Sequence, residues 1–313
     1  MLINLLSDFF AVLENADPLG AYRRYFETHH RVLDAYWRNY VVDPESSHFP
    51  DVVRGTVLAS RADLRAMLQR TDVPALASSV ERRCGELLAI DVPFDIVLMV
   101  GVGAANAGEL VVDGRGVAFV CLEHFTGVAN PETRGLGLDP ALVPLWLSHE
   151  IAHVVRYTAP HSRSDLRAAI DESDGCYSYW DTGRRVPLRE LVVNEGLAVQ
   201  TARAVSPGHA EWVYFGYTRR HYARIREMEA VLTRAVAEDI DRVGLGLRLR
   251  YLSDGMSDEA RTVAHCVLPE RTGYYLGNRM VERVVAERGL PWAIRASAEE
   301  IAVADSATTA ITA

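Results

Sequence analysis

The pattern of apolar and polar positions changes character twice along the chain. Residues 3–40 carry apolar and aromatic side chains at helical spacing, and Pro18 with Gly20 divides this segment into two predicted helices. Helical spacing returns over 60–89. After Pro93, short β-branched runs separated by glycines predict three strands joined by turns. The predicted strands cover 94–102, 108–114 and 117–125.

From residue 140 onward the spacing is again mostly helical. The pattern therefore predicts an α+β fold with N-terminal helices, a small and mostly antiparallel sheet, and a largely helical C-terminal half. We find no internal repeat and no long linker. We expect an N-terminal helical region over 1–90 followed by a second region over 91–313, or one continuous domain over 1–313.

Composition and charge narrow the classes of partner. The formal net charge is −9, which disfavours a nucleic acid as the main partner. The N-terminus lacks a basic region, Asp8 interrupts its apolar run, and no later apolar run is long enough to span a bilayer. We therefore expect no membrane partner and a cytoplasmic location. The four cysteines are far apart and form no C-x-x-C pair, which indicates free thiols.

The stretch LWLSHEIAHVVRY, residues 145–157, contains an H-E-x-x-H motif. On an α-helix, positions i and i+4 lie on one face, so His149 and His153 can present two imidazoles to one cation. Glu150 lies beside them, near enough to act on a water at the metal. Uncharged neighbours indicate that this helix is buried around the site.

A catalytic zinc site usually has three protein ligands, so a third ligand is expected elsewhere in the chain. The favoured candidate is Glu195 in LRELVVNEGLAVQTARAV, residues 188–205. It precedes the small residues Gly196 and Ala198 in an apolar helical pattern, and small residues allow two helices to approach closely. A carboxylate buried there would be unfavourable unless it were paired or bound to a metal.

Together with PERTGYYLGNRMVERVV, residues 269–285, these motifs resemble a known family. H-E-x-x-H-x-x-R, E-G-L-A and G-Y-x-x-G are similar to motifs of gluzincin-type zinc metallopeptidases, and in particular of a mostly bacterial family of predicted zinc-dependent proteases. The resemblance covers roughly the C-terminal two-thirds of the chain. It implies a zincin-like fold, with the sheet packed on the motif helix, and one Zn²⁺ per chain.

The resemblance also implies roles for residues around the metal. Tyr274 is the first candidate to stabilise the oxyanion, with Tyr275 and His265 in reserve. Arg156 is expected to be a structural partner or to support the ligands, and Asn194 is a further residue expected beside them. Packing at a helix start is an equal alternative for Tyr274.

The implied reaction is hydrolysis of a peptide bond in a peptide or protein substrate. Glu150 would act as general base on a zinc-activated water and deliver the proton to the leaving amine. We expect the strand over 117–125 to be an edge to which an extended peptide adds, although Glu123 and His124 could be plain surface residues. The long segment 154–194 is expected to pass over the cleft, so the substrate range should be restricted.

Three alternatives remain open at this point. Two imidazoles and one carboxylate also suit non-haem Fe(II), which would make the protein an oxygenase or hydroxylase. A catalytically inactive binding protein could keep the same fold. The motif could also occur by chance on an ordinary packed helix, but three buried polar side chains would then need other partners.

Overall fold

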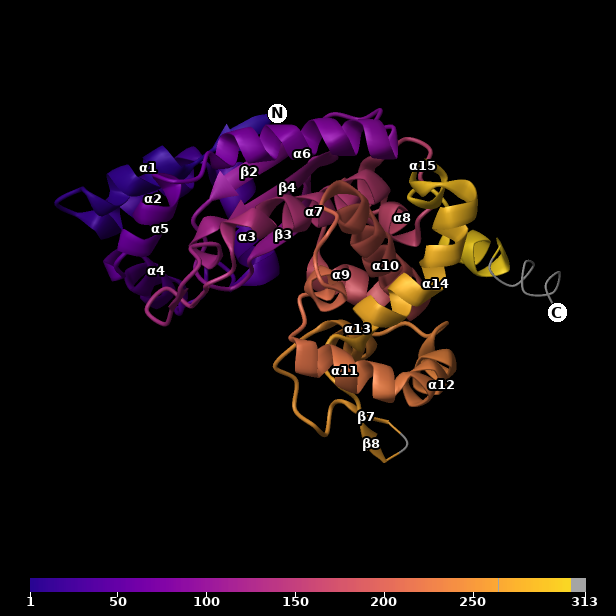
Figure 1. The fold of residues 1–313 in the computed structure, drawn as a ribbon. Coiled ribbons are helices and arrows are strands. Elements are labelled where there is room, and N and C mark those ends of the chain that lie inside the picture. The colour runs from indigo at the N-terminus through magenta and orange to yellow at the C-terminus, as the bar shows by residue number, and fades with distance from the viewer. Residues whose placement is uncertain (264, 305–313) are drawn as a thin grey trace.

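The computed structural model describes residues 1–263 and 265–304 and has an α+β fold (Figure 1). Its main sheet has four strands in the order β1-β2-β4-β3. The strands are β1 (Leu2–Asn4), β2 (Phe94–Met99), β3 (Ala107–Val112) and β4 (Arg115–Cys121). The predicted α+β class and the three strands after Pro93 are confirmed.

The sheet is mixed, and the prediction that it is mostly antiparallel was wrong. β1 pairs with β2 and β2 pairs with β4 in parallel, and only β3 and β4 are antiparallel. The tight turn at Asp113 and Gly114, both at positive φ, returns the chain so that β4 lies between β2 and β3. The loop over 100–106 therefore joins two strands that are not neighbours. Strand order depends on such distant pairings, which apolar spacing does not encode.

Both faces of β4 are covered, which explains its almost continuous apolar sequence. One face packs on α7 (Val143–Thr158), where Gly116 lies against Val154. The opposite face carries Phe119, whose ring contacts the rings of Tyr36 and Tyr40 from α3 (His30–Tyr40). The sheet therefore lies between the motif helix and the N-terminal helices.

The N-terminal segment differs from its prediction in its first residues and in its number of helices. Residues 2–4 form a sheet strand, although the helical pattern was expected to begin at residue 3, because three residues are too few to show an alternation. Pro18 begins a helix, as predicted. A second boundary at His29 divides the segment into three helices instead of the expected two. The remaining N-terminal helices are α1 (Leu6–Leu13), α2 (Pro18–Thr28), α4 (Phe49–Leu58), α5 (Ala62–Leu68) and α6 (Val73–Leu88).

The C-terminal half is helical, as predicted. α10 (Leu188–Val205) packs against α7 on one side and against α14 (Thr272–Arg288) on the other. The remaining helices and short strands are α8 (Asp165–Asp171), α9 (Tyr179–Arg185), α11 (Arg219–Glu227), α12 (Glu229–Asp239), α13 (Leu245–Leu252), α15 (Leu290–Ala293), β5 (Ala129–Asn130), β6 (Gly135–Leu136), β7 (Thr262–Val263) and β8 (Cys266–Val267). The smaller helices α11, α12 and α13 lie below α14 in Figure 1, and the β7–β8 hairpin lies at the lower tip, far from α7.

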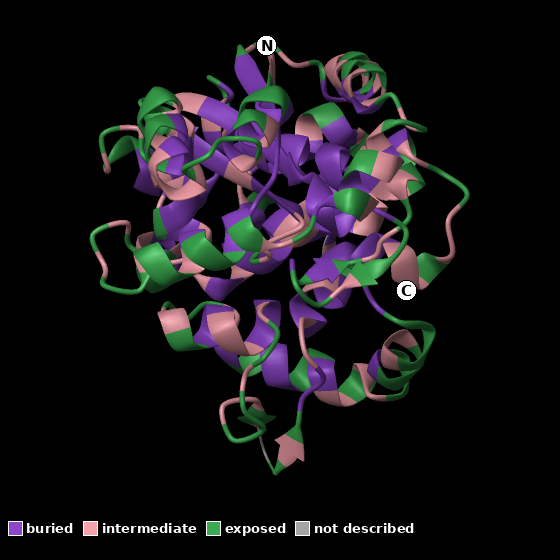
Figure 2. Ribbon diagram, turned by 90° about the vertical axis from the view of Figure 1, so that its left-hand side faces the viewer, coloured by how far each residue is buried: buried purple, intermediate pink, exposed green. Residues whose placement is uncertain are grey.

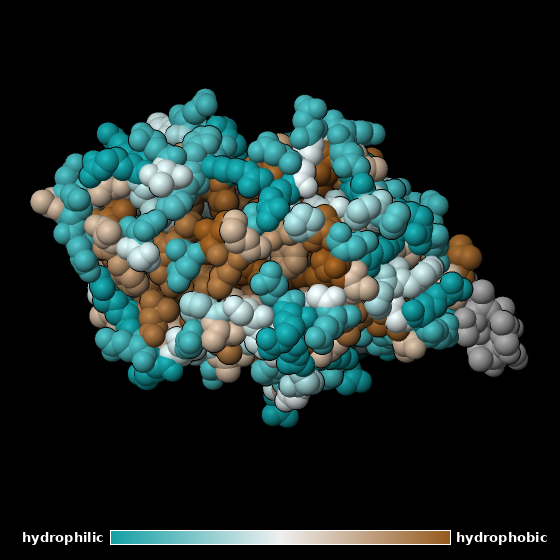
Figure 3. Space-filling view, turned by 90° about the horizontal axis from the view of Figure 1, so that it is seen from above, coloured by the Kyte–Doolittle hydropathy of each residue, from teal (hydrophilic) through white to brown (hydrophobic). Residues whose placement is uncertain are grey.

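Buried residues form a core that extends from the N-terminal helices through the sheet to α7, α10 and α14 (Figure 2). Seen from above, apolar side chains show across the middle of the surface and polar side chains form its rim (Figure 3). Within the described residues, no helix combines the length and the apolar character needed to cross a bilayer. The core therefore places the motif helix at the centre of the molecule.

Candidate metal centre

The motif helix α7 is the most buried helix around the site. Every residue from Leu145 to Tyr157 is buried, including the polar side chains of the motif. Pro144 lies in its first turn, where a missing N–H is harmless, and Ala159 before Pro160 adopts an extended conformation that ends it. The site therefore stands on a rigid element rather than on a loop.

α10 brings the third predicted ligand to the two imidazoles. The Oε2 atom of Glu195 lies 3.2 Å from Nε2 of His149 and 3.5 Å from Nε2 of His153. One ligand atom from each of the three residues lies within 4.8 Å of the others. We call His149, His153 and Glu195 the ligand triad. Among the described residues, it is the only group of three or more such side chains with this spacing.

Glycines set the distance between α10 and α14. A Cβ atom on Gly196 would lie 2.2 Å from the backbone of Gly277, and a Cβ atom on Gly277 would lie 1.9 Å from the carbonyl oxygen of Val192. The glycines of N-E-G-L-A and G-Y-x-x-G thus form the crossing point of two helices. This crossing places Glu195 and Tyr274, each close in sequence to one of the glycines, in the same site.

Aromatic rings hold the two imidazoles in place. The Tyr274 ring stacks on His149 at a centroid distance of 6.0 Å, and the Trp146 ring lies 5.7 Å from the same imidazole. Tyr157, one helical turn after His153, stacks on it at 6.0 Å. In most metal sites the second nitrogen of a ligating histidine is hydrogen-bonded. Here ring packing fixes the orientation, because neither Nδ1 atom has a partner among the described residues.

A second carboxylate, which the sequence analysis missed, faces the expected general base. Glu109 on β3 lies within hydrogen-bonding reach of the buried Glu150. Burial and the Glu109 carboxylate together raise the pKa of Glu150 well above its ordinary value. A carboxyl group with a raised pKa holds a proton more readily, which suits a group that must accept and return one.

Tyrosine hydroxyls fix Glu109. Tyr157 donates to its Oε1 at 3.1 Å, and Tyr40 lies 2.9 Å from its Oε2. Asn194 in turn donates to the Tyr157 hydroxyl at 3.0 Å, and this bond connects it to the site through Tyr157. Glu109 gave no sequence signal beyond a charge inside an apolar strand, whereas Tyr157 could have been found from its spacing to His153.

Burial and mutual contacts shift the pKa values of the three residues of the ligand triad in different directions. Burial lowers the pKa of His149 below its ordinary value, despite the bond to Glu195. At His153 burial opposes the charged form too, but the Glu195 carboxylate outweighs it and raises the pKa to about 10. Burial alone would raise the pKa of Glu195, and the two imidazoles reverse this and lower it. His149 is therefore neutral and able to bind a cation.

The three candidates for the oxyanion role lie in different places. Tyr274 is at the site, stacked on His149. Tyr275 points away, because its hydroxyl donates to Glu229 at 2.9 Å and its ring packs on Phe215. His265 is exposed in the β7–β8 hairpin, far from α7 (Figure 1). The two reserve candidates were therefore wrong, since adjacent residues on a helix face different directions and the hairpin projects away.

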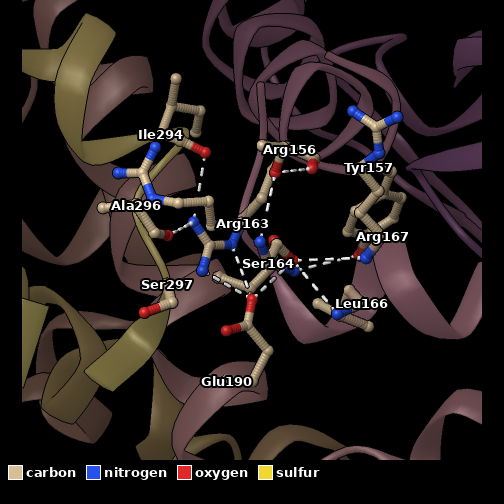
Figure 4. A network of polar contacts seen from close by, with 12 residues as sticks. Arg156, Tyr157, Arg163, Ser164, Leu166, Arg167, Glu190, Ile294, Ala296 and Ser297 are labelled. Carbon is tan, nitrogen blue, oxygen red and sulfur yellow. Dashed lines mark hydrogen bonds and ion pairs between the residues drawn. The ribbon is translucent and has the colours of Figure 1, made fainter. Parts of the chain in front are cut away.

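Arg156 is a structural residue. It is fully buried, and its Nη2 lies 2.6 Å from Oε1 of Glu190, one turn before Glu195 on α10. It also donates to the carbonyl oxygens of Ile294 and Ala296, and Ser164 donates to the same Glu190 oxygen (Figure 4). The network ties α7 to α10 and to the segment after α15. These contacts agree with the structural alternative for Arg156.

The expected edge for peptide addition was wrong. β4 is a central strand with neighbours on both sides, and Glu123 and His124, which follow it, are buried rather than on the surface. The edge beside the site is β3. Three of its outward backbone groups are already bonded, because Tyr40 bonds to both the N–H and the carbonyl of Glu109, and the Tyr177 N–H donates to the carbonyl oxygen of Val111. A substrate strand could add there only after these contacts were broken.

The segment 154–194 supplies one of these covering contacts, because Tyr177 belongs to it. Its ring stacks on Tyr157 at 5.3 Å, and Arg248 donates to its hydroxyl at 2.8 Å. The predicted excursion thus begins beside the ligand triad and passes along the β3 edge.

No protein-family model, curated protein or solved structure matches the chain. The zincin-like packing and the membership of a zinc peptidase family therefore stay predictions that rest on the motifs and on the geometry described above.

Proposed function

We propose that this protein is a zinc-dependent peptidase of the gluzincin type. The observation that carries the proposal is the convergence of the ligand triad from two helices, with Glu150 beside it on α7. Two imidazole nitrogens and one carboxylate oxygen are a usual protein ligand set for catalytic zinc. A packed helix without a metal would have no reason to bury these polar side chains together.

The residues present fit a zinc ion. Both Nε2 atoms already point at the same oxygen of Glu195, and the neutral His149 needs no deprotonation to act as a ligand. When bound, zinc supplies a Lewis acid and lowers the pKa of water to about 7. We assign His149, His153 and Glu195 as its ligands, one ion per chain.

Glu150 moves the proton in the proposed reaction. Its carboxylate takes the proton of the attacking water and delivers it to the nitrogen of the leaving amine. Glu109, held by Tyr157 and Tyr40, opposes Glu150 from the strand side and fixes its position. Such a base beside the metal is what a hydrolase requires and what an iron oxygenase using the same ligand triad does not.

Tyr274 is the proposed donor to the developing oxyanion. Its ring is fixed against His149, and the Arg271 guanidinium lies over the same ring, 4.3 Å from its centroid. A phenolic hydroxyl held in this way can donate its proton to a carbonyl oxygen of a peptide or protein substrate.

The Glu150→Gln variant tests the proposal. Zinc-loaded protein is incubated with a mixture of synthetic peptides, and the products are identified by mass spectrometry. We expect wild type to cleave and Glu150→Gln to lose nearly all activity, because the amide accepts no proton, while it keeps its zinc. Glu86→Gln, the same change on the surface of α6, should cleave like wild type. Full activity of Glu150→Gln would contradict the assigned mechanism.

A further inference from the structure

The side chain of Arg271 is a cation that lies beside the acidic residues of the site. The Arg271 guanidinium stacks over the Tyr274 ring, 4.3 Å from its centroid, and Tyr274 stacks in turn on His149. Trp146, which also packs on His149, lies close by, because a Cβ atom on Gly216 would approach both its ring and an Arg271 nitrogen. Arg271 therefore lies beside the aromatic residues that contact His149.

The backbone holds Arg271 in a conformation that a non-glycine residue rarely adopts. Its φ is 54°, in the left-handed region, directly before α14. The Tyr217 hydroxyl donates to its carbonyl oxygen at 2.5 Å, and the His221 ring nitrogen bonds to the preceding carbonyl of Glu270 at 2.9 Å. The surrounding structure thus keeps this side chain at the site against a local cost of about 1 kcal/mol or more.

Space for the guanidinium comes from Gly216. A Cβ atom there would lie 3.0 Å from an Arg271 nitrogen and 2.9 Å from the Trp146 ring. The glycine adopts a φ of +66°, so its lack of a side chain serves both the turn and the close approach.

The guanidinium has no carboxylate partner within ion-pair distance in the part of the chain that the structure describes. It stacks on the Tyr274 ring, and the exposed Asp254 acts on it only from farther away. Other half-buried arginines form ion pairs with carboxylates, as Arg189 and Arg203 do. A planar guanidinium stacked on a ring keeps its N–H edge available for a carboxylate.

We propose that Arg271 binds a carboxylate group of the substrate close to the scissile bond. This inference rests on the proposed function, and it names the substrate class as peptides that carry a carboxylate group close to the scissile bond. Glu109, Glu150 and Glu195 would repel such a substrate, and the fixed cation beside Tyr274 offsets that repulsion. The carboxylate comes from an Asp or Glu side chain or from the C-terminus of the peptide, since both present the same group.

Binding to a zinc-loaded protein that cannot cleave tests this assignment. The probes are short acetylated alanine peptides bearing one Glu, their Gln counterparts, and the unsubstituted peptide with either a free or an amidated C-terminus. Their affinities are measured by calorimetry on Glu150→Gln and on Glu150→Gln with Arg271→Gln. We expect the second change to weaken a carboxylate probe about tenfold or more and to leave the neutral probes within about twofold. The probe that responds, Glu or free C-terminus, identifies the source of the carboxylate.

Two further variants separate binding from packing. Arg226→Gln, which removes another arginine stacked on a tyrosine in α11, should change no affinity. Arg271→Lys keeps the charge without the planar fork, so it should recover part of the lost affinity, which a merely structural role would not predict.

Glutarate, a free dicarboxylate, makes the test independent of peptide cleavage. If no peptide binds but glutarate binds wild type about tenfold more tightly than Arg271→Gln, the carboxylate site stands and the peptidase proposal fails. If neither glutarate nor any carboxylate peptide distinguishes wild type from Arg271→Gln, the inference is overturned, whether or not peptides are cleaved.

Discussion

At the scale of single residues, the site depends on rings as much as on charges. His149 lies between Trp146 and Tyr274, and His153 stacks on Tyr157. Each of these aromatic residues therefore contributes to where a metal ligand points. Tyr274 has two separable properties, because its ring packs on His149 while its hydroxyl is the proposed donor to the oxyanion.

Tyr274→Phe keeps the ring and removes the hydroxyl. We expect kcat to fall about 10²-fold or more, with a smaller change in KM, and zinc affinity to stay at the wild-type level. Tyr274→Ala removes the stack too, so zinc affinity should also fall. Tyr275→Phe loses only a bond to Glu229 away from the site and serves as the control. Wild-type kinetics for Tyr274→Phe would return this residue to a packing role.

At the scale of secondary-structure elements, the helices of the site could be predicted and the strands around it only in part. H-E-x-x-H is a local spacing pattern, and Glu195 is a carboxylate in a strongly apolar helix, so both could be singled out as candidate ligands from the sequence. The order of the strands and the covered β3 edge depend on contacts between residues distant in the chain. Glu109 was missed for the same reason, since its importance comes from Glu150, which follows it by about forty positions.

The crossing of α10 and α14 gives a test at this scale. In Gly196→Ala the new methyl group would meet the backbone of Gly277, which cannot move aside as a side chain could. We expect a loss of about 1–3 kcal/mol in the free energy of unfolding, together with weaker zinc binding, because α10 carries Glu195. Chemical denaturation and zinc titration measure the two effects.

The matched control for that variant is Gly85→Ala in α6, where no atom lies within 4 Å of the added Cβ. There alanine should leave stability unchanged or raise it by up to about 1 kcal/mol, because it favours the helix. Equal behaviour of the two variants would show that the α10–α14 crossing tolerates a methyl group.

At the scale of the whole molecule, the site lies under a covered sheet edge. Tyr40 from the N-terminal helices and Tyr177 from the segment before α10 occupy the backbone groups of Glu109 and the carbonyl of Val111 on β3. An extended chain cannot pair along the whole of this edge as the structure stands. A peptidase built in this way accepts only substrates that displace the cover or avoid it.

We therefore expect slow or undetectable cleavage of unfolded casein under conditions in which a cleaved acidic peptide turns over readily. Gel electrophoresis over time measures the first rate, and mass spectrometry of the peptide measures the second. Rapid and unselective degradation of casein would show that the β3 edge is open to any extended chain.

The most direct measurement of the central claim is the metal content of the protein purified without added metal, compared between wild type and His149→Ala. We predict about one equivalent of zinc in wild type and almost none in the variant, because two remaining ligands hold zinc poorly. Iron at the same stoichiometry would contradict the peptidase and favour an oxygenase. Absence of any transition metal, even after reconstitution, would contradict the metal centre itself.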